Sequence, residues 1–133
     1  MTEGTGAISP LDILRGRKIL IVEDEPFIAL TLEDMLTDLG CIIAGSVSQV
    51  ADALALIREG GIDAAVLDVN LGSQKIDPVA DELADKSCPF IFTTGYGRAG
   101  VPPSHNRRGI VAKPFTSEDL ARALSQEISG RPA

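Results

Sequence analysis

Length, composition and charge describe a small globular domain and exclude several functions. The 133 residues fit one domain and are enough to bury a core. Hydrophobic residues make up 44% of the chain, yet no apolar run approaches the ~20 residues that a membrane-spanning helix needs. The formal net charge of −7 argues against nucleic-acid binding, which requires a basic surface to displace counterions.

The first residues and the two cysteines indicate where the chain works. The opening MTEGTGAISP has no basic region followed by an apolar stretch, which argues against a secretory signal. Cys41 and Cys88 have no metal-type spacing and each begins an apolar segment, so we expect two small buried thiols. A cytoplasmic location follows by elimination.

Regular structure is expected to begin after a flexible N-terminal arm, or an irregular lead-in, over residues 1–16. Lys18–Val22 is a short, β-branched apolar run that is typical of a buried parallel strand. Pro26 suits the first turn of the helix that follows. Apolar side chains then recur at helical spacing until Gly40 ends that helix.

The alternation of strand and helix continues along the chain. Asp77-Pro78 is a cap followed by a proline in the first turn, and Thr116 with Asp119 resembles a capping box, so each pair marks a helix start. Another helix begins at Val50. The further strands are expected at residues 41–47, 64–69, 89–94 and 109–113.

The segment between the fourth and fifth expected strands breaks this alternation. Glycine costs ~1 kcal/mol and proline ~3 kcal/mol in a helix interior, so we expect a short or irregular fourth helix here. The residues concerned are Gly95, Gly97, Gly100, Pro102, Pro103 and Gly109.

Five strands that alternate with helices predict an α/β fold, a doubly wound five-stranded parallel sheet with helices on both faces. Right-handed crossovers leave few ways to wind such a sheet, and the common solution has strand order 2-1-3-4-5. Ligands of this fold bind at the carboxyl ends of the strands, beside the switch point between the first and third strands.

Polar residues stand at the carboxyl ends of four expected strands. Each has an ordinary structural explanation when taken alone, such as a carboxylate at a helix N-terminus. Their shared position instead predicts one cleft that holds three carboxylates, a hydroxyl and an ammonium. The residues are Glu23 and Asp24 after the first strand, Asp68 and Asn70 at the third, Thr94 at the fourth and Lys113 at the fifth.

This set of groups suits phosphoryl transfer beside a magnesium ion. Clustered carboxylates repel one another unless a cation lies among them, and hard oxygen ligands in a small site suit Mg²⁺. The metal neutralises both a carboxylate nucleophile and the incoming phosphoryl oxygens. Lys113 adds a point charge and Thr94 a hydrogen bond. We therefore expect Asp68, which leaves a buried strand, to accept a phosphoryl group.

Four segments together resemble the receiver domains of two-component response regulators, over residues 17–129. They are KILIVEDEP, AAVLDVNLG, PFIFTTGYG and VAKPF. The resemblance implies that Asp68 is the phosphoacceptor, that Thr94 hydrogen-bonds the phosphoryl group and that Lys113 pairs with it. It also implies a cis peptide bond between Lys113 and Pro114.

The same resemblance implies a metal and a protein partner. Asp24 would bind Mg²⁺ directly and Asp68 would belong to the same metal site. Glu23 would contribute, often through water, and Asn70 would use its backbone carbonyl. The partner implied is a histidine kinase or a phosphotransfer protein. The resemblance names no downstream protein, and it leaves homodimerisation through helix faces open.

The TTGYG segment resembles a receiver subgroup named for a Phe-Ala-Thr-Gly-Tyr motif. Members are typically single-domain alphaproteobacterial proteins that work with histidine kinases of the HWE type or related ones. Thr93 stands where that motif has alanine. Ile110 stands where receivers usually carry an aromatic switch residue, three positions before the lysine, and we hypothesise that Tyr96 takes over part of that role.

Residues 130–133 form the expected C-terminal tail, so we expect a single-domain regulator that signals by contact or by phosphoryl relay. His105 lies in the Gly/Pro-rich loop and is expected to be a solvated side chain, not a phosphotransfer histidine. We expect no enzyme beyond self-catalysed phosphoryl transfer and autodephosphorylation.

Three alternatives stay open. A haloacid-dehalogenase-type phosphatase needs an acid/base two residues after its nucleophile, where this chain has Asn70. A flavodoxin-like protein needs a phosphate-binding loop after the first strand, where this chain has Glu-Asp-Glu-Pro. A receiver-like module that binds partners without phosphorylation is not excluded by any residue.

Overall fold

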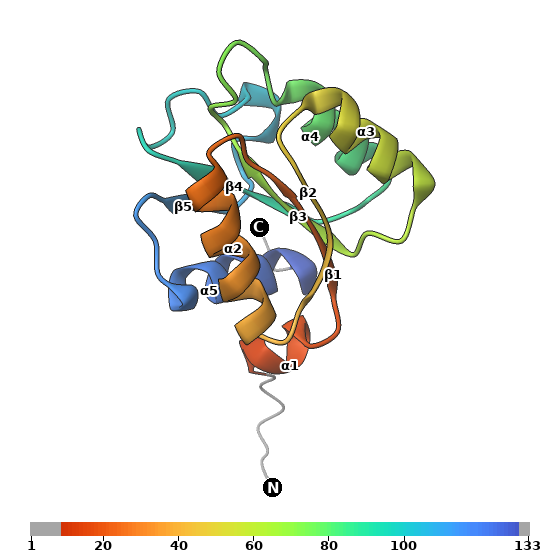
Figure 1. Cartoon of the computed structure of the whole chain (residues 1–133), viewed down its shortest axis with the longest axis vertical. Helices are drawn as coiled ribbons and strands as arrows, with labels where there is room; N and C mark the ends of the chain where they lie inside the picture. Colours follow the sequence, from red (N-terminus) through yellow and green to blue (C-terminus); the bar gives the residue numbers. More distant parts are fainter. Residues whose placement is uncertain (1–8, 131–133) are drawn as a thin grey trace, which may run out of the picture.

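A five-stranded parallel sheet forms the centre of residues 9–130, the part of the chain that this computed structural model describes (Figure 1). The strands lie in the order β2-β1-β3-β4-β5, and every neighbouring pair is parallel. The fold and strand order expected from the sequence are confirmed. The strands are β1 (Lys18–Val22), β2 (Ile42–Val47), β3 (Ala64–Asp68), β4 (Phe90–Thr94) and β5 (Ile110–Ala112).

Helices cover both faces of the sheet, with α2 and α5 on one face and α3 and α4 on the other (Figure 1). Within residues 9–130, no helix combines the length and the apolar character that crossing a membrane requires. The helices are α1 (Pro10–Leu14), α2 (Pro26–Asp38), α3 (Val50–Glu59), α4 (Asp77–Asp85) and α5 (Ser117–Ile128).

Two hydrophobic cores result from the alternation of side chains along the strands. Ile19 and Ile21 of β1 pack in the core with α2 and α5, whereas Leu20 and Val22 pack in the core with α3 and α4. All five side chains of β3 are buried, because helices cover this central strand on both sides. Asp68, the last residue of β3, is therefore held in a fixed place by a rigid strand.

The two cysteines belong to these cores as isolated thiols. Cys41 is buried in one core, and Cys88 is half-buried against the other. Burial raises the pKa of each thiol to about 11, so both carry their proton at neutral pH. Their role is one of packing.

The connection between β4 and β5 contains a short 3₁₀-helix, η1 (Pro103–His105), as expected for a segment rich in glycine and proline. The prediction that His105 is solvated is wrong, since its side chain is only 10% exposed. Nε2 of His105 lies 2.7 Å from Oδ1 of Asp81 on α4. Its ring meets the ring of Phe90 edge-on, with centroids 5.5 Å apart. The connection is thereby fastened to α4 and β4.

Helix α1 departs from the flexible arm expected over residues 1–16, of which residues 1–8 lie outside the described part of the chain. Ser9 caps this helix by accepting the backbone N–H of Asp12. Leu14 is fully buried in the same hydrophobic core as the apolar side chains of α5. A five-residue helix has little stability of its own, so this one depends on packing against the other end of the chain, which the local sequence does not reveal.

Truncation of the buried side chain of α1 should therefore destabilise the whole domain. We expect Leu14→Ala to lower the free energy of unfolding by about 2–5 kcal/mol, the usual range for a buried leucine. Leu11→Ala is the matched control, because Leu11 lies on the same helix but is 49% exposed. Urea unfolding measures both variants. Equal, small effects would show that α1 does not contribute to the core.

Candidate functional site

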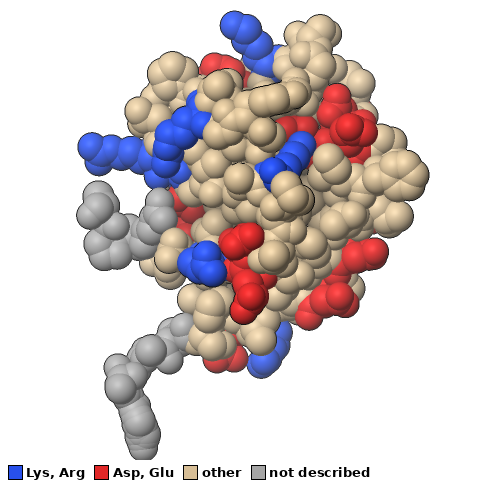
Figure 2. Space-filling model, turned by 90° about the vertical axis from the view of Figure 1, so that its left-hand side faces the viewer, with Lys and Arg blue, Asp and Glu red and all other residues tan. Residues whose placement is uncertain are grey.

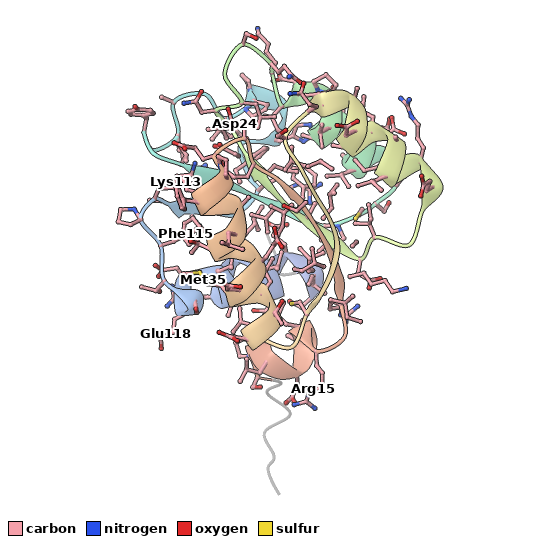
Figure 3. All side chains as sticks on the ribbon, in the orientation of Figure 1. Arg15, Asp24, Met35, Lys113, Phe115 and Glu118 are labelled. Carbon is pink, nitrogen blue, oxygen red and sulfur yellow. The ribbon has the colours of Figure 1, made fainter. Side chains whose placement is uncertain are left out.

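The carboxyl ends of the strands surround an open cavity of about 490 Å³. Asp24 follows β1, Asp68 ends β3 and Lys113 follows β5, and all three line the cavity together with Asn70 and Tyr96. Figure 3 shows Asp24 and Lys113 at the same end of the sheet. The sheet topology thus brings together polar groups that are far apart in the sequence.

The carboxylate of Asp68 lines this cavity although the residue is only 1% exposed. Its Oδ1 accepts the backbone N–H of Asn70 at 3.0 Å, and its Oδ2 lies 3.3 Å from Nζ of Lys113. A buried carboxylate requires such partners because an unpaired charge in the interior is costly. Both oxygens are consequently held in defined directions.

Glu23 places a second buried carboxylate beside Asp68 and is 2% exposed. Its Oε2 accepts the backbone N–H of Glu25 at 3.0 Å, and its Oε1 lies 3.2 Å from Nζ of Lys113. One oxygen from each of Glu23, Asp24 and Asp68 lies within 4.8 Å of the others. Asp24 is exposed, so the cluster opens to solvent on that side.

Burial and neighbouring charges shift the pKa values of Glu23 and Lys113. Burial raises the pKa of Glu23 to about 7, with the N–H of Glu25 opposing the shift and the Asp68 carboxylate adding to it. Burial also opposes the charge of Lys113, but the attraction of Asp68 and Glu23 outweighs burial and raises its pKa above the ordinary value. Lys113 is therefore a permanent positive charge at neutral pH, whereas Glu23 exchanges its proton there.

The structure brings five of the six predicted site residues together and leaves one aside. Glu23, Asp24, Asp68, Asn70 and Lys113 form the cluster just described. The peptide bond that leads from the lysine into proline is cis, as the resemblance implies. The sixth residue, Thr94, does not line the cavity.

The two threonines at the end of β4 face opposite sides of the sheet. Thr94 is fully buried outside the cavity lining, and its Oγ1 accepts the backbone N–H of Tyr96 at 3.1 Å. Thr93 is the β4 residue in register with Asp68. Strand alternation alone predicts that Thr93 and Thr94 point to opposite faces, and the position before Gly95 favours Thr94 as the site residue. The register of β3 and β4, which the sequence does not give, places Thr93 on the face of Asp68.

Comparison with known proteins decides the family. Residues 19–125 match the family model of the response regulator receiver domain. The chain belongs to the response regulator receiver family. Receiver domains are signalling domains that bind Mg²⁺ at an acidic pocket and interact with histidine kinases or phosphotransfer proteins.

Several receivers resemble this one in sequence and structure. The solution structure of SdrG from Sphingomonas melonis Fr1 is 49% identical, with a TM-score of 0.76, and the match covers 83% of this chain and 94% of SdrG. The phyllosphere-induced regulator PhyR of Methylorubrum extorquens is 31% identical over 115 residues, which are 84% of this chain and 43% of PhyR. The transcriptional regulatory protein PdtaR of Mycobacterium tuberculosis is 28% identical over 129 residues, 94% of this chain and 63% of PdtaR. The chain thus spans less than two thirds of the length of these two curated relatives.

The donor groups of this receiver fit a magnesium ion. Three carboxylate oxygens converge to within 4.8 Å, and exposed Asp24 leaves one side open to water. Mg²⁺ favours such a site, because it binds one or two carboxylates and keeps several waters. A divalent cation would also offset the burial and the nearby Asp68 carboxylate that together raise the pKa of Glu23.

The raised pKa of Glu23 predicts how the stability of the metal-free protein changes with pH. Between the ordinary value of 4.5 and about 7 the folded protein binds more protons than the unfolded chain, so stability falls as pH rises across this range and levels off above it. We expect Glu23→Gln, which mimics the protonated side chain, to stay within about 1 kcal/mol of wild type at pH 5. At pH 8 it should be more stable by about 1–3 kcal/mol.

Urea unfolding in EDTA at several pH values measures this difference. Glu25→Gln is the matched control, since Glu25 is an exposed neighbour on the same loop. A constant difference between wild type and Glu23→Gln from pH 5 to pH 8 would contradict the prediction.

Proposed function

We propose that this receiver is a response regulator that accepts a phosphoryl group on Asp68 in the presence of Mg²⁺. One observation carries the proposal. The carboxylate of Asp68 is fixed at a cavity open to solvent, 3.3 Å from a lysine ammonium and within 4.8 Å of two further carboxylates. This arrangement holds a nucleophile, a point charge and a cation site within reach of one phosphoryl group.

The transfer step requires little movement of the protein. A carboxylate oxygen of Asp68 forms a bond to phosphorus while the P–N bond of a donor phosphohistidine breaks. The electron pair of that bond stays on the leaving nitrogen, and the imidazole, which keeps the proton on its other nitrogen, departs neutral. The hydrogen bond from the N–H of Asn70 orients the carboxylate. The ammonium of Lys113 lies where it can neutralise charge on the transferred oxygens.

Four groups of this chain would hold the metal. Asp24 and Asp68 supply direct carboxylate ligands, Glu23 contributes through water, and Asn70 supplies its backbone carbonyl. The bound ion would supply charge neutralisation for the nucleophile and for the phosphoryl oxygens. The proposal draws support from the convergence of the three carboxylates.

Thr94 takes part after the phosphoryl group arrives. Its hydroxyl oxygen accepts the N–H of Tyr96, and its hydroxyl proton is free to donate elsewhere. We assign it a hydrogen bond to the phosphoryl group once the side chain turns toward the cavity. That rotation would break the bond to Tyr96 and so loosen the start of the β4–β5 connection.

Intact-mass spectrometry after incubation with acetyl phosphate and Mg²⁺ tests the acceptor. We expect wild type to gain one phosphoryl group, and we expect no gain in EDTA or in Asp68→Asn. Asp81→Asn is the matched control, because Asp81 is an aspartate outside the cavity and should leave labelling unchanged. An unlabelled wild type, under conditions that label another receiver, would favour a module that binds partners without phosphorylation.

The phosphatase and the flavodoxin-like alternatives have no support in this site. Asn70 occupies the position where a phosphatase of the haloacid-dehalogenase type needs an acid/base, and its backbone N–H is bonded to Asp68. Glu23 and Asp24 occupy the loop where a flavin phosphate would bind, and their charges would repel it.

The partner we propose is a histidine kinase, of the HWE type or a related one, or a phosphotransfer protein. Beside Lys113 lies an apolar pocket of about 310 Å³, lined by Ile28, Thr31, Pro114 and Phe115. Phe27, at the start of α2, is 83% exposed. An apolar surface next to the phosphoacceptor suits a helix of the phosphodonor, and Figure 3 shows Phe115 beside α2.

The charge of the protein supports a protein partner and not a nucleic acid. Figure 2 shows acidic side chains in separate patches over one face of the molecule, with basic side chains scattered among them. This face lacks the continuous basic stripe that binding to a phosphate backbone requires, and the net charge of −7 also opposes such binding.

We also propose membership of the subgroup with the Phe-Ala-Thr-Gly-Tyr motif, on the strength of the TTGYG segment and the likeness to SdrG. The receiver unit would cover residues 17–129 with α1 packed against it, and the protein would work in the cytoplasm. Homodimerisation is tested by light scattering with and without phosphorylation.

Tyr96 is the candidate for coupling the phosphoryl group to the β4–β5 connection. Its ring lines the cavity and is 77% exposed, while its N–H is bonded to Thr94. We expect phosphorylation to shift the amide resonances of residues 97–109, and we expect Tyr96→Ala to remove most of these shifts. Tyr96→Phe, which keeps the ring, is the control. Unchanged shifts in Tyr96→Ala would exclude this role.

A further inference from the structure

Thr93 is a buried polar residue that the proposed transfer step does not use. It is 0% exposed, and within residues 9–130 its Oγ1 has no hydrogen-bond partner. A buried hydroxyl without a partner is destabilising, and valine of nearly the same shape would avoid that penalty. A hydroxyl at such a position therefore calls for a state of the protein in which it is used.

The register of the sheet places Thr93 in the row of the phosphoacceptor. Thr93 pairs with Asp68 on one side and with Val111 on the other. Val66 stands two positions before Asp68 on β3, and Ile91 stands two positions before Thr93 on β4. Both belong to the core beneath α2 and α5. Because side chains two residues apart share a face, Thr93 and Asp68 project to that same side of the sheet.

The side chain of Lys113 crosses this row. Its backbone N–H is bonded to the carbonyl of Thr94 at the end of β4. Its Nζ nevertheless lies 3.3 Å from Asp68, at the end of β3, and 3.2 Å from Glu23, beyond the end of β1. To reach these carboxylates the lysine passes over β4 on the face that Thr93 occupies.

We propose that Thr93 is a positioning residue for Lys113, and that its hydroxyl oxygen accepts a hydrogen bond from the lysine ammonium when that ammonium turns from Asp68 to a phosphoryl group. An ammonium has three N–H donors, and only two carboxylates face it here. On phosphorylation the negative charge of the Asp68 carboxylate passes to the phosphoryl oxygens, so the ammonium turns toward them and leaves an N–H to donate to the hydroxyl of Thr93. The inference rests on the proposed phosphorylation of Asp68.

The competing explanation is that Thr93 only packs, as β-branched residues do in strands. The two explanations differ in what Thr93→Val does. If the residue only packs, valine leaves phosphorylation unchanged. Under either explanation valine removes an unpartnered hydroxyl and should raise the thermal midpoint of the unphosphorylated protein. If the hydroxyl positions Lys113, valine also slows phosphorylation.

The test is a double-mutant cycle on Thr93 and Lys113, read by the rate of labelling with acetyl phosphate and Mg²⁺. We expect Thr93→Val to slow labelling about tenfold, the effect of one lost hydrogen bond to a charged group. Thr93→Ser, which keeps the hydroxyl, should stay within about twofold of wild type. In a Lys113→Met background, Thr93→Val should have no further effect.

A second readout does not depend on activity. In wild type loaded with beryllofluoride, a mimic of the phosphoryl group, the Nζ resonance of Lys113 should differ from that of Thr93→Val. Equal labelling of wild type and Thr93→Val, or the same loss with and without Lys113, would overturn the inference and leave the proposed function intact. A wild type that takes no label would overturn both.

Discussion

The ammonium of Lys113 is the interaction on which the site depends. Two carboxylates, Asp68 and Glu23, are almost completely buried at the ends of adjacent strands, where each would repel the other and neither is well solvated. One ammonium lies between them at 3.2 and 3.3 Å. Without it the interior would hold two uncompensated charges, a situation that proteins avoid by taking up protons or metals. The repulsion between these carboxylates also favours the binding of a second cation at the site.

The doubly wound sheet makes this arrangement possible. A parallel strand buried on both faces delivers its last residue to one edge with little freedom, and β3 does so for Asp68. The order 2-1-3-4-5 places β1 beside β3, so that acidic residues following one strand meet the aspartate of the next. Helices packed on both faces hold this edge of the sheet in place, so conformational changes are confined to the loops that connect strands and helices.

Much of this could be predicted from the sequence, because the relevant signals are local. Short apolar runs followed at once by Glu23, Asp68 or Lys113 identify both the strands and the groups at their ends. Features that depend on distant partners were missed. Helix α1 exists because Leu14 packs in the core with α5, and His105 is shielded because Asp81 and Phe90 meet it. Thr93 was given no functional role for a different reason. A motif comparison shows which residue type stands at a position, whereas the strand register shows which side chains lie next to it, and here Thr93 is paired with Asp68.

The connection between β4 and β5 has an energetic consequence of its own. It lacks the continuous backbone hydrogen bonding of a full helix, and side-chain contacts such as His105 with Asp81 and Arg98 with the carbonyl of Asn106 hold it. Such contacts contribute about 1 kcal/mol each. A nearly complete reversal of a two-state equilibrium requires about 5.5 kcal/mol of differential binding. The conformational preference of this segment is therefore of the same order as what the proposed phosphoryl dianion would supply through a few charge-assisted hydrogen bonds. A chemical event at one aspartate would then be enough to redistribute the conformations of a whole surface loop.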